Sequence, residues 1–145
     1  MSVDVLTEIE IQRPRDEVAA FAADPANATA WYKNIKSVEW ETPPPAAVGS
    51  RVRFVARLLG RTLAYTYAIR EVEPGRRLVM HTAEGPFPME TIYTWEDAGE
   101  AATRMTLRNR GEPSGFAALS APLMTRAMRR ANEADLRRLK ELLEA

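Results

Sequence analysis

Four polar side chains stand where neighbouring residues alternate between apolar and charged, as they do along a half-buried strand. They are Tyr65, Tyr67, Tyr93 and Asn109. A phenol or an amide held in an apolar setting could orient or polarise a carbonyl group, for example during an aldol-type cyclisation. Glu90 could serve as a base nearby, but its place in the alternation points it outward and predicts a surface carboxylate.

Seven stretches of the chain show the period of two that predicts strands. They cover residues 3–11, 37–41, 51–58, 63–72, 78–82, 89–96 and 103–110. Most of the connections between them are too short for a crossover helix, so we expect antiparallel pairing. Val72 breaks the parity of the fourth stretch, which predicts a bulge near Arg70 and Glu71.

Helical signals occur in two places. Pro14 and Asp24-Pro25 are typical helix starts and predict two short helices after the first strand, with Trp31 and Tyr32 near the end of the second. From about Gly115 the period becomes that of a long helix, in which Pro122 predicts a kink or a restart. Its apolar stripe consists of Phe116, Leu123, Ala127, Met128, Ala131, Leu139 and Leu142.

A curved antiparallel sheet and one long helix bury their apolar faces when the sheet wraps around the helix. We therefore expect an α+β fold: seven antiparallel strands curved around a long C-terminal helix, with two short helices after the first strand. The 145 residues are enough for one domain with its own core, spanning 1–145. This arrangement tends to leave a cavity between sheet and helix.

The inward positions converge on one volume and predict a small-molecule pocket with an apolar wall and a few polar points. The predicted ligand-binding residues are Phe54, Tyr65, Tyr67, Met80, Thr91, Tyr93, Trp95, Met105, Asn109, Phe116, Leu123 and Ala127. The alternative is that these side chains fill a solid core. Inward tyrosines and an asparagine need hydrogen-bond partners, which favours a cavity, although ordered water could satisfy them equally well. Trp31 and Tyr32 either shape the entrance or clamp the short helices onto the sheet.

Composition argues against several classes of function. Lys+Arg and Asp+Glu both count 20, so no net charge favours nucleic acid or an anionic membrane. There is no cysteine, and the single histidine, His81, falls on the outer parity, so we expect no metal and no cofactor. No apolar run reaches the roughly 20 residues of a bilayer span, and the first residues lack signal-peptide features. We expect a cytoplasmic protein that is a monomer or a weak homodimer.

Two strands carry outward rows of arginine: Arg51, Arg53, Arg57, Arg104, Arg108 and Arg110. Neighbouring glutamates and zero net charge favour a solvated face with cross-strand ion pairs over a nucleic-acid surface.

Several segments together resemble one protein family. They are residues 15–25 with Trp31 downstream, 48–54, 73–78, 85–87, 93–96 and the arginine-rich last helix. These segments resemble the SRPBCC superfamily, also called START-like or helix-grip, and within it the polyketide cyclase/dehydrase branch. The resemblance covers nearly the whole chain and implies a hydrophobic cavity between sheet and long helix. Members include ligand carriers, cyclases and aromatases, and no shared catalytic motif carries over to this chain.

Three functions remain open. The leading hypothesis is binding of a small apolar or aromatic molecule, such as a lipid, a polyketide or a related metabolite, with the loops at 43–48 and 85–88 shaping access. The second is a cofactor-independent polyketide cyclase or dehydratase that uses the same cavity. The third is a co-chaperone-like module that binds proteins through its sheet surface.

Overall fold

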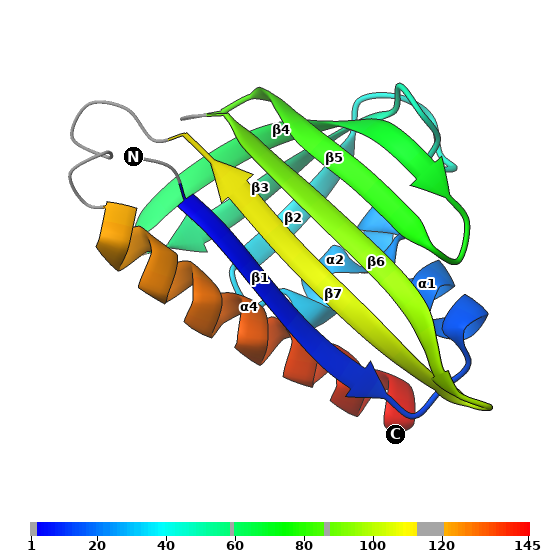
Figure 1. The fold of residues 1–145 in the computed structure, drawn as a ribbon. Coiled ribbons are helices and arrows are strands. Elements are labelled where there is room, and N and C mark those ends of the chain that lie inside the picture. Colours follow the sequence, from blue (N-terminus) through cyan, green and yellow to red (C-terminus); the bar gives the residue numbers. More distant parts are fainter. Residues whose placement is uncertain (1–2, 59, 86–87, 113–120) are drawn as a thin grey trace.

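The computed structural model describes residues 3–58, 60–85, 88–112 and 121–145. Seven antiparallel strands form one curved sheet, and a long helix lies along its concave side (Figure 1). The strand order is β1-β7-β6-β5-β4-β3-β2, so every strand neighbours the next in sequence except β1, which pairs with β7. The predicted α+β helix-grip architecture is confirmed.

The elements follow one another as expected from the sequence. In chain order they are β1 (Val3–Ile11), α1 (Arg15–Ala22), a 3-10 turn η1 (Pro25–Asn27), α2 (Ala28–Trp31), β2 (Ile35–Trp40), β3 (Arg51–Leu58), β4 (Arg61–Glu73), β5 (Arg77–Glu84), β6 (Met89–Gly99), β7 (Ala102–Gly111) and α4 (Ala121–Glu144).

The start of η1 confirms a predicted cap. The carboxylate of Asp24 accepts a hydrogen bond from the Ala26 backbone N–H at 2.9 Å, and Pro25 occupies the first position of the turn. A proline in the first turn of a helix loses no intrahelical hydrogen bond. The same holds for Pro122, which lies in the first turn of α4 and therefore does not kink it.

The strand register places the predicted inner residues on one face. Phe54 pairs with Tyr65, and Met80 pairs with Thr91, which in turn pairs with Asn109. The register between β4 and β5 shifts between Ile69 and Glu71, which confirms the predicted bulge. His81, one residue from Met80, falls on the convex face, as its parity predicts.

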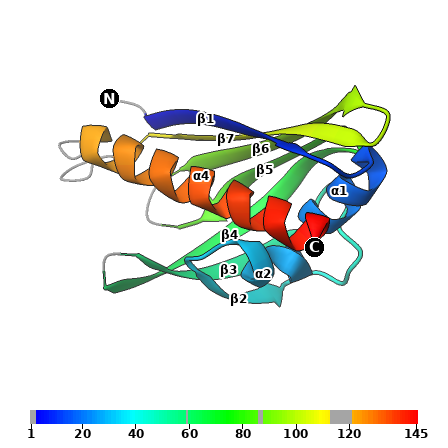
Figure 2. The same cartoon turned by 90° about the horizontal axis from the view of Figure 1, so that it is seen from below.

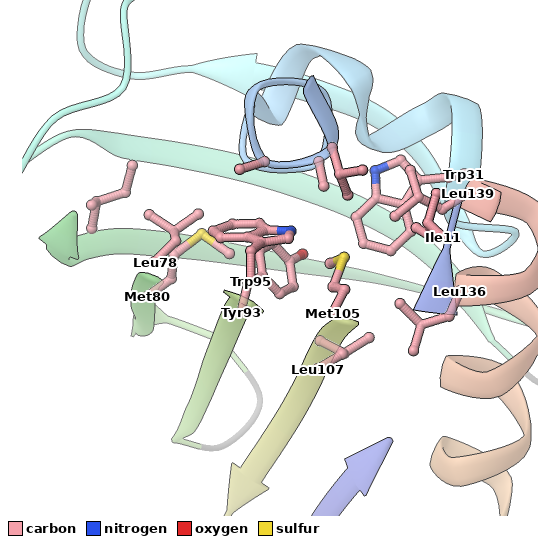
Figure 3. Packing of buried hydrophobic residues seen from close by; sticks show 14 residues of the cluster. Ile11, Trp31, Leu78, Met80, Tyr93, Trp95, Met105, Leu107, Leu136 and Leu139 are labelled. Atoms are coloured by element: carbon pink, nitrogen blue, oxygen red, sulfur yellow. The ribbon is translucent and has the colours of Figure 1, made fainter. Parts of the chain in front are cut away.

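Concave residues and the short helices form the main core. Trp31 of α2, Trp95 of β6 and Met105 of β7 are almost completely buried, and Leu136 and Leu139 of α4 close the cluster. Figure 3 shows Tyr93, Trp95 and Met105 pointing from the sheet into the space below the helices.

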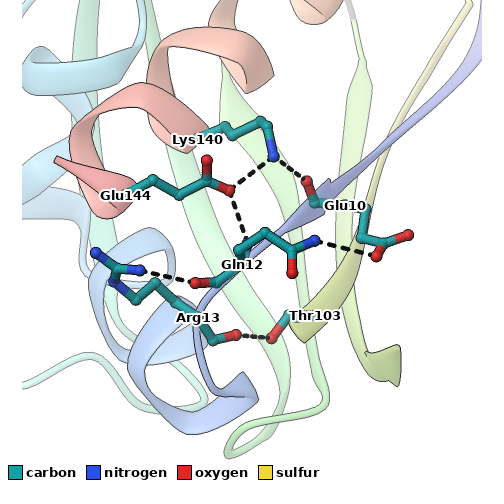
Figure 4. Close-up of polar contacts among 6 residues, drawn as sticks. All are labelled: Glu10, Gln12, Arg13, Thr103, Lys140 and Glu144. Carbon is teal, nitrogen blue, oxygen red and sulfur yellow. Dashed lines mark hydrogen bonds and ion pairs between the residues drawn. The ribbon is translucent and has the colours of Figure 1, made fainter. Parts of the chain in front are cut away.

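The long helix α4 lies closest to one edge of the sheet. Its backbone follows β1 and touches α2, while the sheet curls away toward β2 on the other side (Figure 2). Polar contacts fix its C-terminal end: Lys140 Nζ donates to the Glu10 carbonyl at 2.8 Å, and the Gln12 backbone N–H donates to Glu144 Oε2 at 2.7 Å (Figure 4). The bond from Lys140 satisfies a carbonyl at the outer edge of β1, where no partner strand lies, and the bond to Glu144 involves the residue that follows β1.

One prediction about α4 is wrong. Leu123 is 68% exposed and Ala127 is also exposed, so neither faces the sheet as the apolar stripe predicted. Leu142, also placed in that stripe, is 41% exposed. The buried face instead includes Asn132 and Asp135, two polar residues that a purely apolar pattern assigns to solvent. Phe116 lies outside the described residues.

The convex face of the sheet carries the predicted ion pairs. Arg51 pairs with Glu41 and Glu84, and Arg110 pairs with Glu90. Two further pairs join Arg53 to Glu39 and Arg108 to Asp4. Glu90 is therefore a surface carboxylate held by an arginine on the neighbouring strand. None of the described helices is long and apolar enough to cross a membrane.

Two leucines of α4 provide a matched test of this helix orientation. Leu139 is fully buried whereas Leu123 is exposed. We expect Leu139→Ala to lower the free energy of unfolding by about 2–5 kcal/mol, because it removes buried contacts and leaves a cavity. Leu123→Ala should change it by less than about 0.5 kcal/mol. Chemical denaturation measures both, and equal losses would show that the helix is rotated from the orientation described here.

Candidate functional site

Aromatic side chains form two groups on the concave side of the sheet. Trp31 and Tyr32 have ring centroids 4.2 Å apart, and Tyr93 lies 5.9 Å from the Trp31 ring and 5.9 Å from the Trp95 ring. A second group joins Phe54 to Tyr67 at 5.7 Å and Tyr67 to Tyr65 at 6.2 Å. These separations suit tilted and edge-to-face contacts, so the wall is aromatic and mostly apolar.

The first polar group on this wall is a pair of phenols. The hydroxyl oxygens of Tyr32 and Tyr93 are 2.5 Å apart, and one donates a hydrogen bond to the other. Burial is the main cause that raises the pKa of both phenols, and the negative charge of Asp135 raises the pKa of each further. Both groups therefore stay protonated at neutral pH, and the pair retains one O–H that can donate to another acceptor.

The second polar group lies nearer β7. Thr91 Oγ1 donates to Asn109 Oδ1 at 2.7 Å, which leaves the amide nitrogen of Asn109 free to donate elsewhere. Burial raises the pKa of the neighbouring Tyr67 phenol to about 12, although its contact with Thr91 acts in the opposite direction. The Tyr67 phenol is therefore neutral at physiological pH.

The third group comes from α4 and was not predicted. Asp135 is only 3% exposed, and its Oδ1 accepts a hydrogen bond from the Lys33 backbone N–H at 3.0 Å. Burial raises the pKa of this carboxyl to about 6, while Lys33 lowers it. Asn132, one turn earlier, is also buried, and its Nδ2 has no hydrogen-bond partner among the described residues.

The concave face is packed at one end and less covered at the other. Beneath Trp31, Tyr93, Met80 and Phe54 the enclosed space measures only about 10 Å³, which is room for about one water molecule. Toward the β3–β4 turn, however, the inward residues Tyr65 and Tyr67 are only half buried. A side chain at Gly85 would begin 2.6 Å from the Tyr65 ring, so glycine is needed for the ring to lie where it does.

A larger groove lies away from the concave aromatic wall, between β1 and α4. It has a volume of about 360 Å³, and its walls include Leu6, Glu8, Arg129 and Glu133. Arg129 Nη1 crosses it to donate to the Leu6 carbonyl at 3.1 Å. This groove is open and lined by charged side chains, and it contains none of the predicted site residues. We therefore place the candidate site on the concave face.

Most of the predicted site residues meet on that face. Those buried there are Phe54, Met80, Thr91, Tyr93, Trp95, Met105 and Asn109, and Tyr65 and Tyr67 are half buried. The structure adds Tyr32, Asn132 and Asp135. Among the residues that the structure describes, no three histidine or carboxylate side chains are grouped so as to hold a metal ion.

Comparison with known proteins identifies the family. A family model described as polyketide cyclase / dehydrase and lipid transport matches residues 2–144. The chain therefore belongs to this family, as its sequence pattern indicated. No curated protein sequence matches it.

Solved structures share the fold along the whole chain. TTHA0849 from Thermus thermophilus is 25% identical, with a TM-score of 0.83 over 95% of this chain and 94% of that one. The Zhui aromatase/cyclase from Streptomyces sp. R1128 is 18% identical, with a TM-score of 0.82 over 99% and 94% of the two chains. The ginseng major latex-like protein 151 from Panax ginseng is 13% identical, with a TM-score of 0.65 over 92% and 97%.

The buried carboxyl gives a prediction about pH and stability. Because the pKa of Asp135 in the fold, about 6, exceeds its ordinary value of 3.8, folding is favoured while the group is protonated. That contribution is present below about pH 4 and is lost as the pH rises through about 6. Asp135→Asn keeps an oxygen that can accept from the Lys33 N–H but carries no charge. The free energy of unfolding of this variant, relative to that of wild type, should therefore increase by about 2–3 kcal/mol between pH 4 and pH 7.

Urea denaturation across this pH range measures the effect. Glu133→Gln, an exposed change of the same charge on the same helix, is the control and should show no such trend. A constant difference between Asp135→Asn and wild type would mean that the carboxyl is not effectively buried.

Proposed function

We propose that the protein binds a small, largely apolar molecule with an aromatic or polyketide-like skeleton on its concave face. The observation that carries this proposal is the half-buried, aromatic stretch of that face near Tyr65 and Tyr67, on the side of the sheet away from β1, the strand that α4 follows. Removing apolar surface of this kind from water is favourable. A flat aromatic molecule between the sheet and the helix would supply that cover.

The polar groups of the wall support the same proposal. A typical small-molecule site has apolar walls with a few fixed hydrogen-bonding groups, and here these are the Tyr32–Tyr93 pair and the Thr91–Asn109 pair. The family description, which combines polyketide chemistry with lipid transport, agrees with this class of ligand.

A second candidate is chemistry on the bound molecule. It is favoured by Asp135, a buried carboxyl close enough to Tyr32 and Tyr93 to influence their ionisation. Buried carboxyls with raised pKa values are frequent at acid–base sites. The structural likeness to an aromatase/cyclase makes cyclisation or dehydration of a polyketide-like substrate the reaction to test. Loss of turnover in Asp135→Asn, with binding retained, would support this second role.

Two tryptophan substitutions test the binding site. Ala56 faces the concave side of β3 opposite Leu63, whereas Ala64, the next residue on β4, faces the convex side. We expect Ala56→Trp to place a large side chain on this stretch of the concave face and to weaken binding of a neutral fluorescent probe such as Nile red by about tenfold or more, or about 1.4 kcal/mol. Fluorescence titration of the purified protein measures the dissociation constant.

Ala64→Trp is the matched control. It adds the same side chain to the neighbouring strand but on the other face, so its dissociation constant should stay within about twofold of wild type. Equal weakening by both substitutions, or by neither, would contradict binding on the concave face.

A further inference from the structure

The positive charges of the chain are unevenly distributed, although its net charge is zero. Two long segments contain arginine but neither aspartate nor glutamate. Residues 42–70 carry five arginines, and residues 113–132 carry three. The first segment includes the hairpin of β3 and β4, and the second includes the N-terminal half of α4.

Both segments reach the same end of the molecule. The β3–β4 hairpin extends beyond the last residue pair between β4 and β5, which is Thr66 with Glu84. The first residue of α4, Ala121, packs against Val3 and Val5 at the start of β1. Because neighbouring strands are antiparallel, β1 and β4 start at the same end of the sheet. Figures 1 and 2 both show the hairpin and the start of α4 at that end, and Figure 2 shows them on opposite sides of the concave face.

Four arginine side chains at this end are exposed and form no ion pair. Arg57 and Arg61 belong to the β3–β4 hairpin, and Arg126 and Arg130 to α4. None of the ion pairs found in the described part of the chain includes any of them, and the remaining residues of the sequence contain no acid. Their charges are therefore available to a partner.

The acidic side chains at the same end leave this positive charge in excess. Asp4, Glu84 and Glu90 are held by Arg108, Arg51 and Arg110, respectively. Glu112, which follows β7, is exposed, and the first acid of α4 is Glu133, in the middle of the helix. We refer to the β3–β4 hairpin and the N-terminal half of α4 together as the basic end. A local excess of one charge attracts partners of the opposite charge even when the whole protein is neutral.

A large apolar side chain lies beside these arginines. Leu123 is 68% exposed, and Arg126 and Arg130 follow it at helical spacing on the outer side of α4. Cations around an exposed apolar residue are typical of helices that lie on an anionic bilayer, where the cations meet the phosphates and the apolar side chain enters the acyl boundary. A soluble polyanion would match the charges but offers no apolar phase for Leu123.

We infer that the basic end docks reversibly on the surface of an anionic phospholipid bilayer. Docking serves the proposed function, on which its purpose rests, because a largely apolar ligand dissolves in a bilayer rather than in water. Arg61 shares the inner face of β4 with Leu63 and Tyr65, so docking through this end brings the half-buried aromatic stretch close to the membrane.

Co-sedimentation of the full chain with lipid vesicles tests this docking. The vesicles consist of phosphatidylcholine, either alone or with about 30% of the anionic lipid phosphatidylglycerol. We expect wild type to bind the anionic vesicles about tenfold or more tightly than the neutral ones, and added salt to weaken this binding. Equal binding to both kinds of vesicle, or binding to neither, would overturn the inference.

Matched arginine substitutions locate the docking surface. Arg126→Gln with Arg130→Gln removes two cations from the basic end and should weaken binding to anionic vesicles by about tenfold or more. Arg70→Gln with Arg76→Gln removes two exposed cations near the β4–β5 turn, at the opposite end of the sheet, and should change binding by less than about twofold. Equal weakening by both pairs would mean that net charge, and not the basic end, determines binding.

Leu123→Ala distinguishes a bilayer from a soluble acidic partner. This substitution keeps every charge and removes an exposed side chain, so it should leave stability unchanged but weaken binding to anionic vesicles about threefold or more. Unchanged vesicle binding by Leu123→Ala would assign the basic end to an acidic protein or peptide and would overturn docking on lipid.

Nile red titration without vesicles separates docking from ligand binding. The substituted residues of α4 are exposed and lie outside the aromatic wall, so the variants should bind the dye as wild type does. Loss of vesicle binding with dye binding retained would support a separate docking surface. Failure of wild type to bind the dye would contradict the proposed function, whereas the vesicle experiments decide docking independently.

Discussion

A single helix is too narrow to cover the sheet that it lies against. An α-helix with its side chains is about 10 Å across, whereas seven strands spaced by about 4.8 Å span about 29 Å. Here α4 takes the β1 side, and α1 and α2 cover part of the remainder. The inner surface of β3 and β4 lies on the other side of the sheet, and there Tyr65 and Tyr67 are only half buried. The proposed binding of a small molecule depends on that shortfall.

At the packed end of the concave face, the protein covers with its own side chains the part of the sheet that α4 does not reach. Large side chains such as Trp31 and Trp95 fill this end of the face, and the space that remains beneath Trp31 measures only about 10 Å³. This packing leaves hydrogen bonds unmade, because the indole N–H groups of Trp31 and Trp95 have no acceptor among the described residues. Asp135 also opposes folding once it is ionised. Groups that cost stability in this way are more often retained for function than for the fold.

Strand parity made much of this structure predictable. Alternation placed Tyr67, Met80 and Asn109 on one face and His81 and Glu90 on the other, and the break at Val72 located the bulge. These predictions work because a strand has only two faces, so one buried residue fixes all of the others.

The buried face of α4 was harder to predict, because a helix can turn any part of its circumference toward the core, whereas a strand has only two faces. Asn132 and Asp135 are buried together with Leu136 and Leu139, one turn apart. A pattern that sends polar residues to solvent therefore put Leu123 on the wrong side. The burial of Asp135 depends on its bond to the Lys33 backbone, a contact across 102 positions that no local pattern contains.

The most direct test of binding on the concave face is methyl NMR of the protein titrated with methyl naphthyl ketone. The methyl groups of Met80 and Met105 lie on the concave face, whereas Ile92, on β6, lies on the convex face. We predict that the methionine signals shift in a saturable way while the Ile92 signals stay in place, because ring currents act only over short distances. Shifts at Ile92 without shifts at the methionines would contradict the account.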